Sequence, residues 1–243
     1  MTEASDPVGT LRAYPDIDTA WKRLKEFTGG EFKEELTDYG TCCLFVEAEF
    51  ARYGPRDFYR LSTGYLYELT HFHFMPHKDP FFRLVTRFAI EHGLRDLGDV
   101  GCGVGLDAQA LSGTGFGVTL YDFPSPSRDY AAWRLQADRG IEGVTRSLGD
   151  LGSVRHDLIY AVDVLEHVPD PVAQVPILLG AADFVVVNLF GHDPSPWDGR
   201  DMHYPLNHWR LLPEFSKGAE LVEVGPSGDT VCTVWRTREG NGA

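Results

Sequence analysis

The sequence has no apolar run near the roughly 18 residues that a membrane-spanning helix needs. Its first ten residues, MTEASDPVGT, have neither the basic nor the apolar region of a signal peptide. Its four cysteines show no spacing typical of a metal site, and adjacent Cys42 and Cys43 are poorly placed to bridge each other. These absences predict a reduced, cytoplasmic protein that spans no membrane and holds no metal.

Positive charge is scarce as well. The chain carries 22 Lys and Arg against 36 Asp and Glu, a formal net charge of −14 at pH 7. Because nucleic acids and anionic membranes attract proteins mainly through Lys and Arg, neither is expected as a partner. A small-molecule partner is expected instead, and a homodimer is left open. With 243 residues, 43% of them hydrophobic, the chain can bury a full core as one domain or as a domain with a cap.

Helical patterns dominate residues 1–78, which we expect to form an N-terminal cap that acts as a substrate lid. Asp16 or Asp18 can cap a helix that ends at Gly29. Apolar residues at mixed helical spacing indicate two more helices, over residues 41–52 and 57–69.

The clearest helical pattern follows this cap. Asp79 is placed as the N-cap and Pro80 as the first helical residue, and Gly93 ends the helix after His92. One face of this helix is apolar and is expected to pack on a core. That face carries Phe81, Leu84, Val85 and Phe88.

From residue 97 onward, short apolar runs alternate with helical stretches, as in a parallel sheet covered by helices. The expected strands are 97–100, 117–121, 157–162 and 184–189, and the expected helices are 106–111, 129–138 and 171–179. Residues 220–224 and 230–235 flank a Gly/Pro turn and predict a hairpin. The fold class is therefore α/β, a Rossmann-like doubly wound sheet over residues 79–237 with an antiparallel C-terminal strand. Residues 238–243 are expected to be a flexible tail.

The stretch DVGCGVGLD, residues 99–107, is a glycine-rich loop between an expected strand and an expected helix. Read from Gly103 it satisfies the dinucleotide pattern G-x-G-x-x-A, which would indicate an NAD(P)-dependent dehydrogenase. Read from Gly101 it is G-x-G-x-G behind Asp99. A carboxylate at that place would repel a pyrophosphate but would attract an ammonium or a sulfonium group.

Other carboxylates bear on this choice. Asp122 ends the second strand, where it can accept hydrogen bonds from a ribose, but dinucleotide enzymes share this feature and it does not discriminate. Asp150 follows the third strand region, where a carboxylate can accept from an adenine amino group. The run DLIYAVDVLEHVPDP, residues 157–171, ends the fourth strand in acidic residues. A row of carboxylates around one pocket fits a cationic ligand and favours S-adenosylmethionine.

Together these motifs resemble the class I S-adenosylmethionine-dependent methyltransferases, and most of all the small-molecule branch that includes the ubiquinone-pathway enzymes. The resemblance covers roughly residues 80–235. It implies that Asp99 helps to hold the amino group of the cofactor, that Asp122 binds the ribose hydroxyls, and that Phe123 packs on the adenine. The loop residues Gly101, Cys102, Gly103 and Gly105 would approach the methionine part, Asp150 and Leu151 the adenine, and Asp163 the methionine end.

Histidines are the candidates for the acceptor side. His167 follows the fourth strand and is the first candidate for a general base, with His203 as the second. Glu166 either orients His167 or faces solvent. Three imidazoles in residues 71–77 invite a metal interpretation, but they lack an acidic or Cys partner at a matching spacing. The residues expected to bind substrate are His73, His77, His192, Trp197 and His208.

The sequence therefore predicts methyl transfer from S-adenosylmethionine to an oxygen, nitrogen or carbon of a small metabolite, a specialised one being an option. Most of the rate can come from holding the nucleophile in line with the methyl group, and a base is needed only if the acceptor must lose a proton. Two alternatives remain: a protein that binds the cofactor as a non-catalytic partner or regulatory subunit, and the dehydrogenase.

Overall fold

A seven-stranded sheet organises the described part of the chain. The computed structural model describes residues 15–76, 78–137, 144–190, 204, 208–227 and 230–238. The strand order is β3-β2-β1-β4-β5-β7-β6, with β7 antiparallel to both of its neighbours and the remaining pairs parallel. The strands are β1 (Asp96–Val100), β2 (Gly117–Asp122), β3 (Val144–Ser147), β4 (His156–Ala161), β5 (Ala182–Phe190), β6 (Ala219–Ser227) and β7 (Thr230–Thr237).

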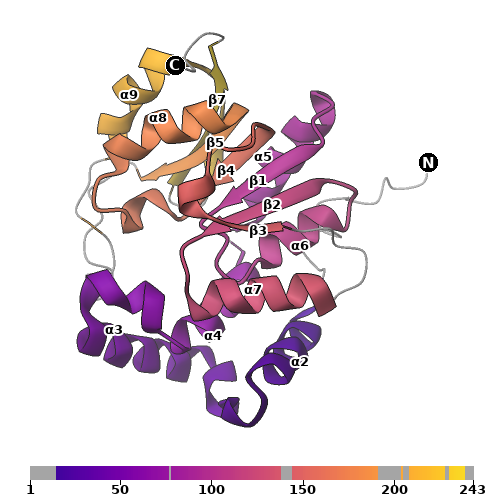
Figure 1. The fold of residues 1–243 in the computed structure, drawn as a ribbon, viewed down its shortest axis with the longest axis vertical. Helices are drawn as coiled ribbons and strands as arrows, with labels where there is room; N and C mark the ends of the chain where they lie inside the picture. Colours follow the sequence, from indigo (N-terminus) through magenta and orange to yellow (C-terminus); the bar gives the residue numbers. More distant parts are fainter. Residues whose placement is uncertain are drawn as a thin grey trace.

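Helices cover the sheet and gather at one end of it (Figure 1). The helices after β1 are α6 (Leu106–Ser112), α7 (Pro126–Ala137), α8 (Pro171–Ala181) and α9 (Leu211–Gly218). Those before it are α2 (Ile17–Thr28), α3 (Tyr39–Leu61), α4 (Gly64–His73) and α5 (Lys78–Glu91). Short 3₁₀ turns are η1 (Gly29–Glu31), η2 (Glu34–Thr37), η3 (Leu148–Asp150), η4 (Leu165–His167) and η5 (His208–Arg210).

The sheet separates two apolar cores, because alternate residues of a strand point to opposite faces. In β4, Leu158 and Tyr160 belong to the core under α5 and α6, whereas Ile159 and Ala161 belong to the core under α8 and α9. The four apolar residues expected on one face of α5 are all buried in the first of these cores. The α/β sheet with its antiparallel C-terminal strand is thus confirmed.

A third core joins the N-terminal helices to the loop that follows β1. Leu24 of α2, Val46 of α3 and Leu66 of α4 share it with Val104 and Leu106. Figure 1 shows α2, α3 and α4 together at the end of the sheet near α7. The cap therefore packs directly on the glycine-rich loop.

Several element boundaries differ from those predicted. The helix expected over residues 57–69 is two helices, since α3 ends at Leu61 and α4 begins at Gly64. Helix α3 also contains a kink at Gly54, whose φ of 73° lies in the left-handed region. Helix α5 begins at Lys78, one residue before the predicted cap, and α9 was not predicted.

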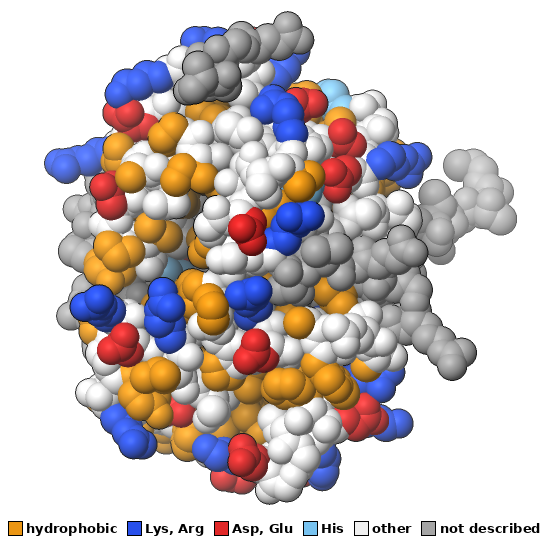
Figure 2. Space-filling view, in the orientation of Figure 1, with side chains coloured by type: hydrophobic (Ala, Val, Ile, Leu, Met, Phe, Trp, Pro, Cys, Tyr) orange, Lys and Arg blue, Asp and Glu red, His pale blue; other side chains and the backbone are white. Residues whose placement is uncertain are grey.

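The surface is mixed in character. The face shown in Figure 2 carries acidic and basic side chains interspersed with apolar ones. Among the described residues, no helix is both long and apolar enough to cross a membrane.

The junction between α3 and α4 depends on one buried carboxylate. Glu49 of α3 accepts hydrogen bonds from the Ser62 hydroxyl (2.5 Å) and the Gly64 amide (2.9 Å). It also accepts two weaker bonds from Thr63. Because the first amides of a helix have no partner within the helix, Glu49 satisfies the N-terminus of α4 and complements its dipole.

We expect Glu49→Ala to lower the free energy of unfolding by about 2 kcal/mol, since it removes hydrogen bonds to a charged group and leaves buried donors unpaired. Urea unfolding followed by circular dichroism measures this. Glu31→Ala, which removes an exposed carboxylate of the same region, is the control and should be nearly neutral. Equal stabilities of the two variants would contradict the assigned role of Glu49.

Candidate functional site

The loop between β1 and α6 has a backbone that only glycine adopts readily. Gly101, Gly103 and Gly105 have φ values of 75°, 51° and 66°. A Cβ at Gly101 would lie 2.5 Å from a Val164 methyl, and one at Gly103 would lie 2.8 Å from a Leu69 methyl. The loop is therefore held closely between the segment after β4 and helix α4.

Asp122, at the end of β2, is bound to this loop. Its Oδ2 accepts from the Gly103 amide (2.9 Å), and its Oδ1 accepts from the Phe123 amide (2.8 Å). Burial raises the pKa of Asp122 to about 6, against the effect of these amides. Each carboxylate oxygen has a second lone pair, so Asp122 can still accept from a ligand hydroxyl.

Asp99, inside the end of β1, is a buried carboxyl with an unused oxygen. Its Oδ2 has no hydrogen-bond partner among the described residues. Burial, followed by the nearby Asp107, raises the pKa of Asp99 well above its ordinary value. A buried oxygen without a partner is costly, so this position suits a ligand that brings a donor or a positive charge.

A buried lysine lies among the carboxylates. Lys78 Nζ is 3.1 Å from Asp163 Oδ2 and 3.6 Å from Asp107 Oδ2. His73 Nδ1 lies 2.7 Å from Asp107 Oδ1. Burial alone would raise the pKa of Asp107, but Lys78 and His73 outweigh burial and lower it. Burial likewise opposes the charge of Lys78, yet the two carboxylates raise its pKa.

Asp163, after β4, has a strained backbone that β5 holds in place. It is the one non-glycine residue of the described chain with a positive φ, at 57°. The Asn188 Oδ1 accepts from the Asp163 amide (2.9 Å), and the Asn188 Nδ2 donates to Asp163 Oδ1 (2.7 Å). Strain of this kind costs about 1–3 kcal/mol and persists where the surroundings determine the conformation.

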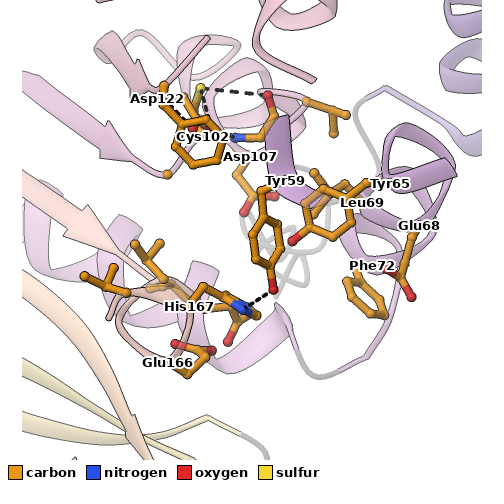
Figure 3. A pocket seen from close by; sticks show the side chains of 18 of the residues that line it. Tyr59, Tyr65, Glu68, Leu69, Phe72, Cys102, Asp107, Asp122, Glu166 and His167 are labelled. Atoms are coloured by element: carbon orange, nitrogen blue, oxygen red, sulfur yellow. Dashed lines mark hydrogen bonds between the residues drawn. The ribbon is translucent and has the colours of Figure 1, made fainter. Parts of the chain in front are cut away.

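These groups line one cavity of about 1080 Å³ between the cap and the carboxyl ends of the strands. Residues of the β1, β2 and β4 ends form one side of it, and α3 and α4 form the other. In Figure 3, Tyr59 projects between Asp122 and His167, with Tyr65, Leu69 and Phe72 of α4 beside it. The carboxyl ends of β1 and β4, where the strand order reverses, are the expected ligand position in such a sheet.

His167 is held by a tyrosine of the cap. The Tyr59 hydroxyl lies 2.7 Å from His167 Nδ1, and the two rings meet edge to face. Figure 3 shows this bond across the cavity. Burial, followed by Glu166, raises the pKa of Tyr59, which therefore stays a neutral phenol. Tyr59, and not Glu166, is the residue seen to orient the imidazole.

Glu166 does not face solvent, contrary to one of the two expectations. It is 1% exposed, lines the cavity, and its Oε2 has no hydrogen-bond partner among the described residues. Burial, followed by the charge of Asp163, raises its pKa to about 8. The turn η4 therefore presents a neutral carboxyl group to the cavity at pH 7.

Most of the predicted cofactor residues line this cavity. They are Asp99, Gly101, Cys102, Gly103, Asp122, Phe123 and Asp163. Gly105 does not line it: a Cβ there would lie 2.8 Å from Leu120 and 3.1 Å from Ala131, so this glycine serves helix packing. His73 and His167 also line the cavity.

Other predicted site residues lie elsewhere. Asp150 is exposed and caps its own turn by accepting from the Ser147 amide, while Leu151 packs against the core, and neither lines the cavity. Leu148, at the start of the same turn, lines the cavity instead. His208 is fully buried at the start of η5 and is not among the described lining residues. His77, His192, Trp197 and His203 lie outside the described residues.

Sequence reasoning missed the cap residues of the site. Tyr59 and Tyr65 carry no local signal, because their position depends on the kink at Gly54 and the break before α4. Lys78 could have been suspected as one of only five lysines, placed beside a predicted helix start. His71, one of the three histidines of residues 71–77, does not line the cavity; its Nε2 lies 3.1 Å from the Leu36 carbonyl oxygen.

Residues 98–176, about a third of the chain, match the family model described as a methyltransferase domain. This segment runs from β1 into α8 and includes the glycine-rich loop, Asp122 and η4. A search of curated proteins finds no match to the chain.

Solved structures share the fold. Magnesium protoporphyrin IX methyltransferase (ChlM) from Synechocystis PCC 6803 with bound SAH has a TM-score of 0.54 at 14% identity, over 96% of this chain and 100% of that one. The N-methyltransferase NodS from Bradyrhizobium japonicum WM9, in complex with S-adenosyl-L-homocysteine, has a TM-score of 0.53 at 16% identity, over 68% of this chain and 89% of that one. At such identities the likeness concerns the fold.

The close approach at Gly101 has a measurable consequence. Gly101→Ala should lower the free energy of unfolding by about 2–4 kcal/mol, from left-handed strain and from displacement of Val164. Gly115→Ala is a matched control, because Gly115 also has a positive φ (92°) but nothing within 4 Å of an added Cβ. Thermal unfolding should show the larger loss for Gly101→Ala, and equal losses would refute the steric argument.

Proposed function

We propose that this chain, a class I S-adenosylmethionine-dependent methyltransferase by its motifs, domain match and fold, methylates a small-molecule acceptor held between the cofactor loop and the cap. The observation that carries the proposal is the single cavity in which the cofactor motifs face Tyr59, Tyr65 and Phe72 of the cap. A cavity of about 1080 Å³ lies at the upper end of the roughly 300–1,000 Å³ typical of ligand pockets, which supports a cofactor with a small acceptor beside it.

The residues present fit the cofactor. The orphaned Oδ2 of Asp99 suits its amino group. The glycine loop, packed closely against Val164 and Leu69, would present its backbone to the methionine part of the cofactor. Asp122 would bind the ribose hydroxyls, and Phe123 would pack on the adenine. Bound there, S-adenosylmethionine supplies an electrophilic methyl group on a positively charged sulfur. Asp163 would flank the methionine end, held in position by Asn188.

The acceptor side carries a group able to move a proton. A neutral imidazole holds one proton, so the direction of the Tyr59 hydrogen bond decides which ring nitrogen carries that proton. If Nδ1–H donates to the Tyr59 oxygen, the His167 Nε2 is left as a base. A hydroxyl acceptor requires such a base, whereas an uncharged amine does not. We assign His167 as the base and Tyr59 as the residue that positions it, with His203 as the second candidate.

The chain is divided in function as follows. Residues 1–78 shape the acceptor pocket and exclude water from it, and residues 79–237 bind the cofactor. The contact of Leu69 with the glycine loop and the bond from Tyr59 to His167 support a cap that closes on the reacting groups. The acceptor is a small molecule that receives the methyl group on oxygen, nitrogen or carbon.

Asp122→Asn tests the cofactor site. The amide keeps the shape but loses charge-assisted hydrogen bonds worth about 1.5–3 kcal/mol, so affinity for S-adenosylmethionine should fall at least about tenfold. Because the ribose hydroxyls donate to the ionised form, wild-type affinity should also decline as the pH drops below about 6, the pKa of Asp122. Calorimetric titration measures both effects, and unchanged affinity in the variant would refute the ribose assignment.

His167→Gln tests the base. With phenols, amines and carboxylic acids as trial acceptors, the release of S-adenosylhomocysteine reports turnover. For a phenol that is turned over, kcat should fall by about 10²–10⁴ while cofactor affinity is unchanged. Tyr59→Phe should reduce kcat less and move the ascending limb of its pH profile. A His167→Gln enzyme that keeps more than half of the wild-type kcat would eliminate His167.

A further inference from the structure

The turn η4 places a second proton-handling group in the cavity. The segment from Val162 to Pro169 runs along the cavity, from Asp163 on the cofactor side to His167 on the acceptor side. Glu166 lies between these two residues, is buried, and has an oxygen without a hydrogen-bond partner among the described residues. Glu166 therefore lines the same cavity as the residues proposed to bind the cofactor and the acceptor.

The surroundings of Glu166 leave it sensitive to added charge. On its own loop Asp163 opposes its ionisation, and from α5 only Lys78 favours it. Lys78 is already shared by Asp163 and Asp107. Among the described residues, the other titratable groups near it are Tyr59 of α3, Tyr65 of α4, the adjacent His167, and Tyr204, whose backbone amide donates to the Glu166 carbonyl. Except for Lys78 and the imidazole, none of these groups can carry positive charge.

We propose that Glu166 is neutral in the free protein, ionises when the sulfonium of the cofactor binds, and takes up the acceptor's proton as that positive charge is lost. This inference rests on the proposed function. It assigns to Glu166 a role that the Tyr59–His167 pair does not fill, which is to keep the net charge of the closed cavity constant through the reaction.

The atoms and charges balance. Before transfer the cavity holds one sulfonium (+1), the Glu166 carboxylate (−1) and an acceptor that carries a proton on its nucleophilic atom. The nucleophile forms a bond to the methyl carbon, the electrons of the carbon–sulfur bond go to sulfur, and the acceptor's proton passes to His167 and from it to Glu166. Afterwards the thioether, the methylated acceptor and the Glu166 carboxyl group are all neutral.

A buried carboxyl group without a nearby cation has a raised pKa, because burial penalises its charged form. Burial, followed by the charge of Asp163, raises the pKa of Glu166 to about 8, so its protonated form predominates at pH 7. A positive charge placed in the cavity lowers that pKa. Binding of the sulfonium form must then release a proton, whereas binding of the neutral thioether must not.

The experiment compares two ligands that differ only at sulfur. S-adenosylmethionine and S-adenosylhomocysteine carry the same ribose, adenine, amino and carboxylate groups, so groups such as Asp122 respond to both alike. Calorimetry in buffers of different ionisation enthalpy gives the protons released per ligand bound. At pH 7 S-adenosylmethionine should release close to one proton more than S-adenosylhomocysteine. Below pH 8, the affinity for S-adenosylmethionine relative to S-adenosylhomocysteine should increase by up to about tenfold for each unit by which the pH is raised.

Glu166→Gln should abolish this difference in proton release and make the affinity ratio of the two ligands independent of pH. Glu68→Gln, which alters another buried carboxyl group lining the cavity, is the matched control and should keep the difference. The assignment to Glu166 would be overturned if Glu68→Gln, and not Glu166→Gln, abolished the difference in proton release between the two ligands. It would also be overturned if the wild-type protein showed that difference only below pH 6.

The wild-type titration alone keeps the proposal testable if the Glu166 variant fails to fold. Equal proton release by the two ligands in the wild type would overturn the inference while leaving cofactor binding intact. Absence of binding by both ligands would instead contradict the proposed function itself. The two failures are therefore distinguishable.

Discussion

The carboxyl groups at the ends of β1, β2 and β4 set the main electrostatic constraint on this molecule. Asp99, Asp122 and Asp163 converge there because parallel strands end at one edge of the sheet, and Glu166 follows Asp163 by three residues in the same cavity. Burying several such groups is unfavourable unless each is paired, bonded to amides or protonated. The chain uses all three solutions: Lys78 pairs with Asp163, backbone amides bind Asp122, and burial keeps Glu166 neutral.

A cationic ligand would relieve the part of this constraint that the protein leaves unmet. Asp99 Oδ2 and Glu166 Oε2 remain without partners in the described chain, and both belong to carboxyl groups lining the same cavity. Leaving such groups unsatisfied costs stability, and a ligand that satisfies them gains affinity in return. The acidic edge of the sheet is thus both a liability for folding and the feature that suits a sulfonium cofactor.

The cap is coupled to this edge by direct contact. Helix α4 is fixed at its N-terminus by Glu49 and touches the glycine loop through Leu69, and α3 reaches η4 through Tyr59. These contacts join residues far apart in sequence, so a displacement of α3 or α4 would alter the position of His167. In the proposed function, the cap would therefore link acceptor binding to the position of His167.

Local patterns predicted the sheet and most of the strand-end residues that line the cavity, because strand ends, glycine spacing and acidic residues are features of short stretches. The loop at Gly101 and the strand-end Asp122 are examples. Asp150 instead caps its own turn, a contact between residues only three apart. The helix expected over 57–69 broke through a contact between more distant residues, because Glu49 caps a new helix at Gly64. The pairing of Tyr59 with His167 spans 108 residues and has no local signal.

A crystal structure with S-adenosylhomocysteine tests the central claim, that the carboxylate edge of the sheet is the cofactor site, most directly. It should show the ribose hydroxyls on Asp122 and the amino group within hydrogen-bond distance of Asp99 Oδ2. The thioether sulfur should face the side of the cavity that carries Glu166 and His167. A ligand bound elsewhere, or one that leaves Asp99 Oδ2 without a partner, would contradict the account.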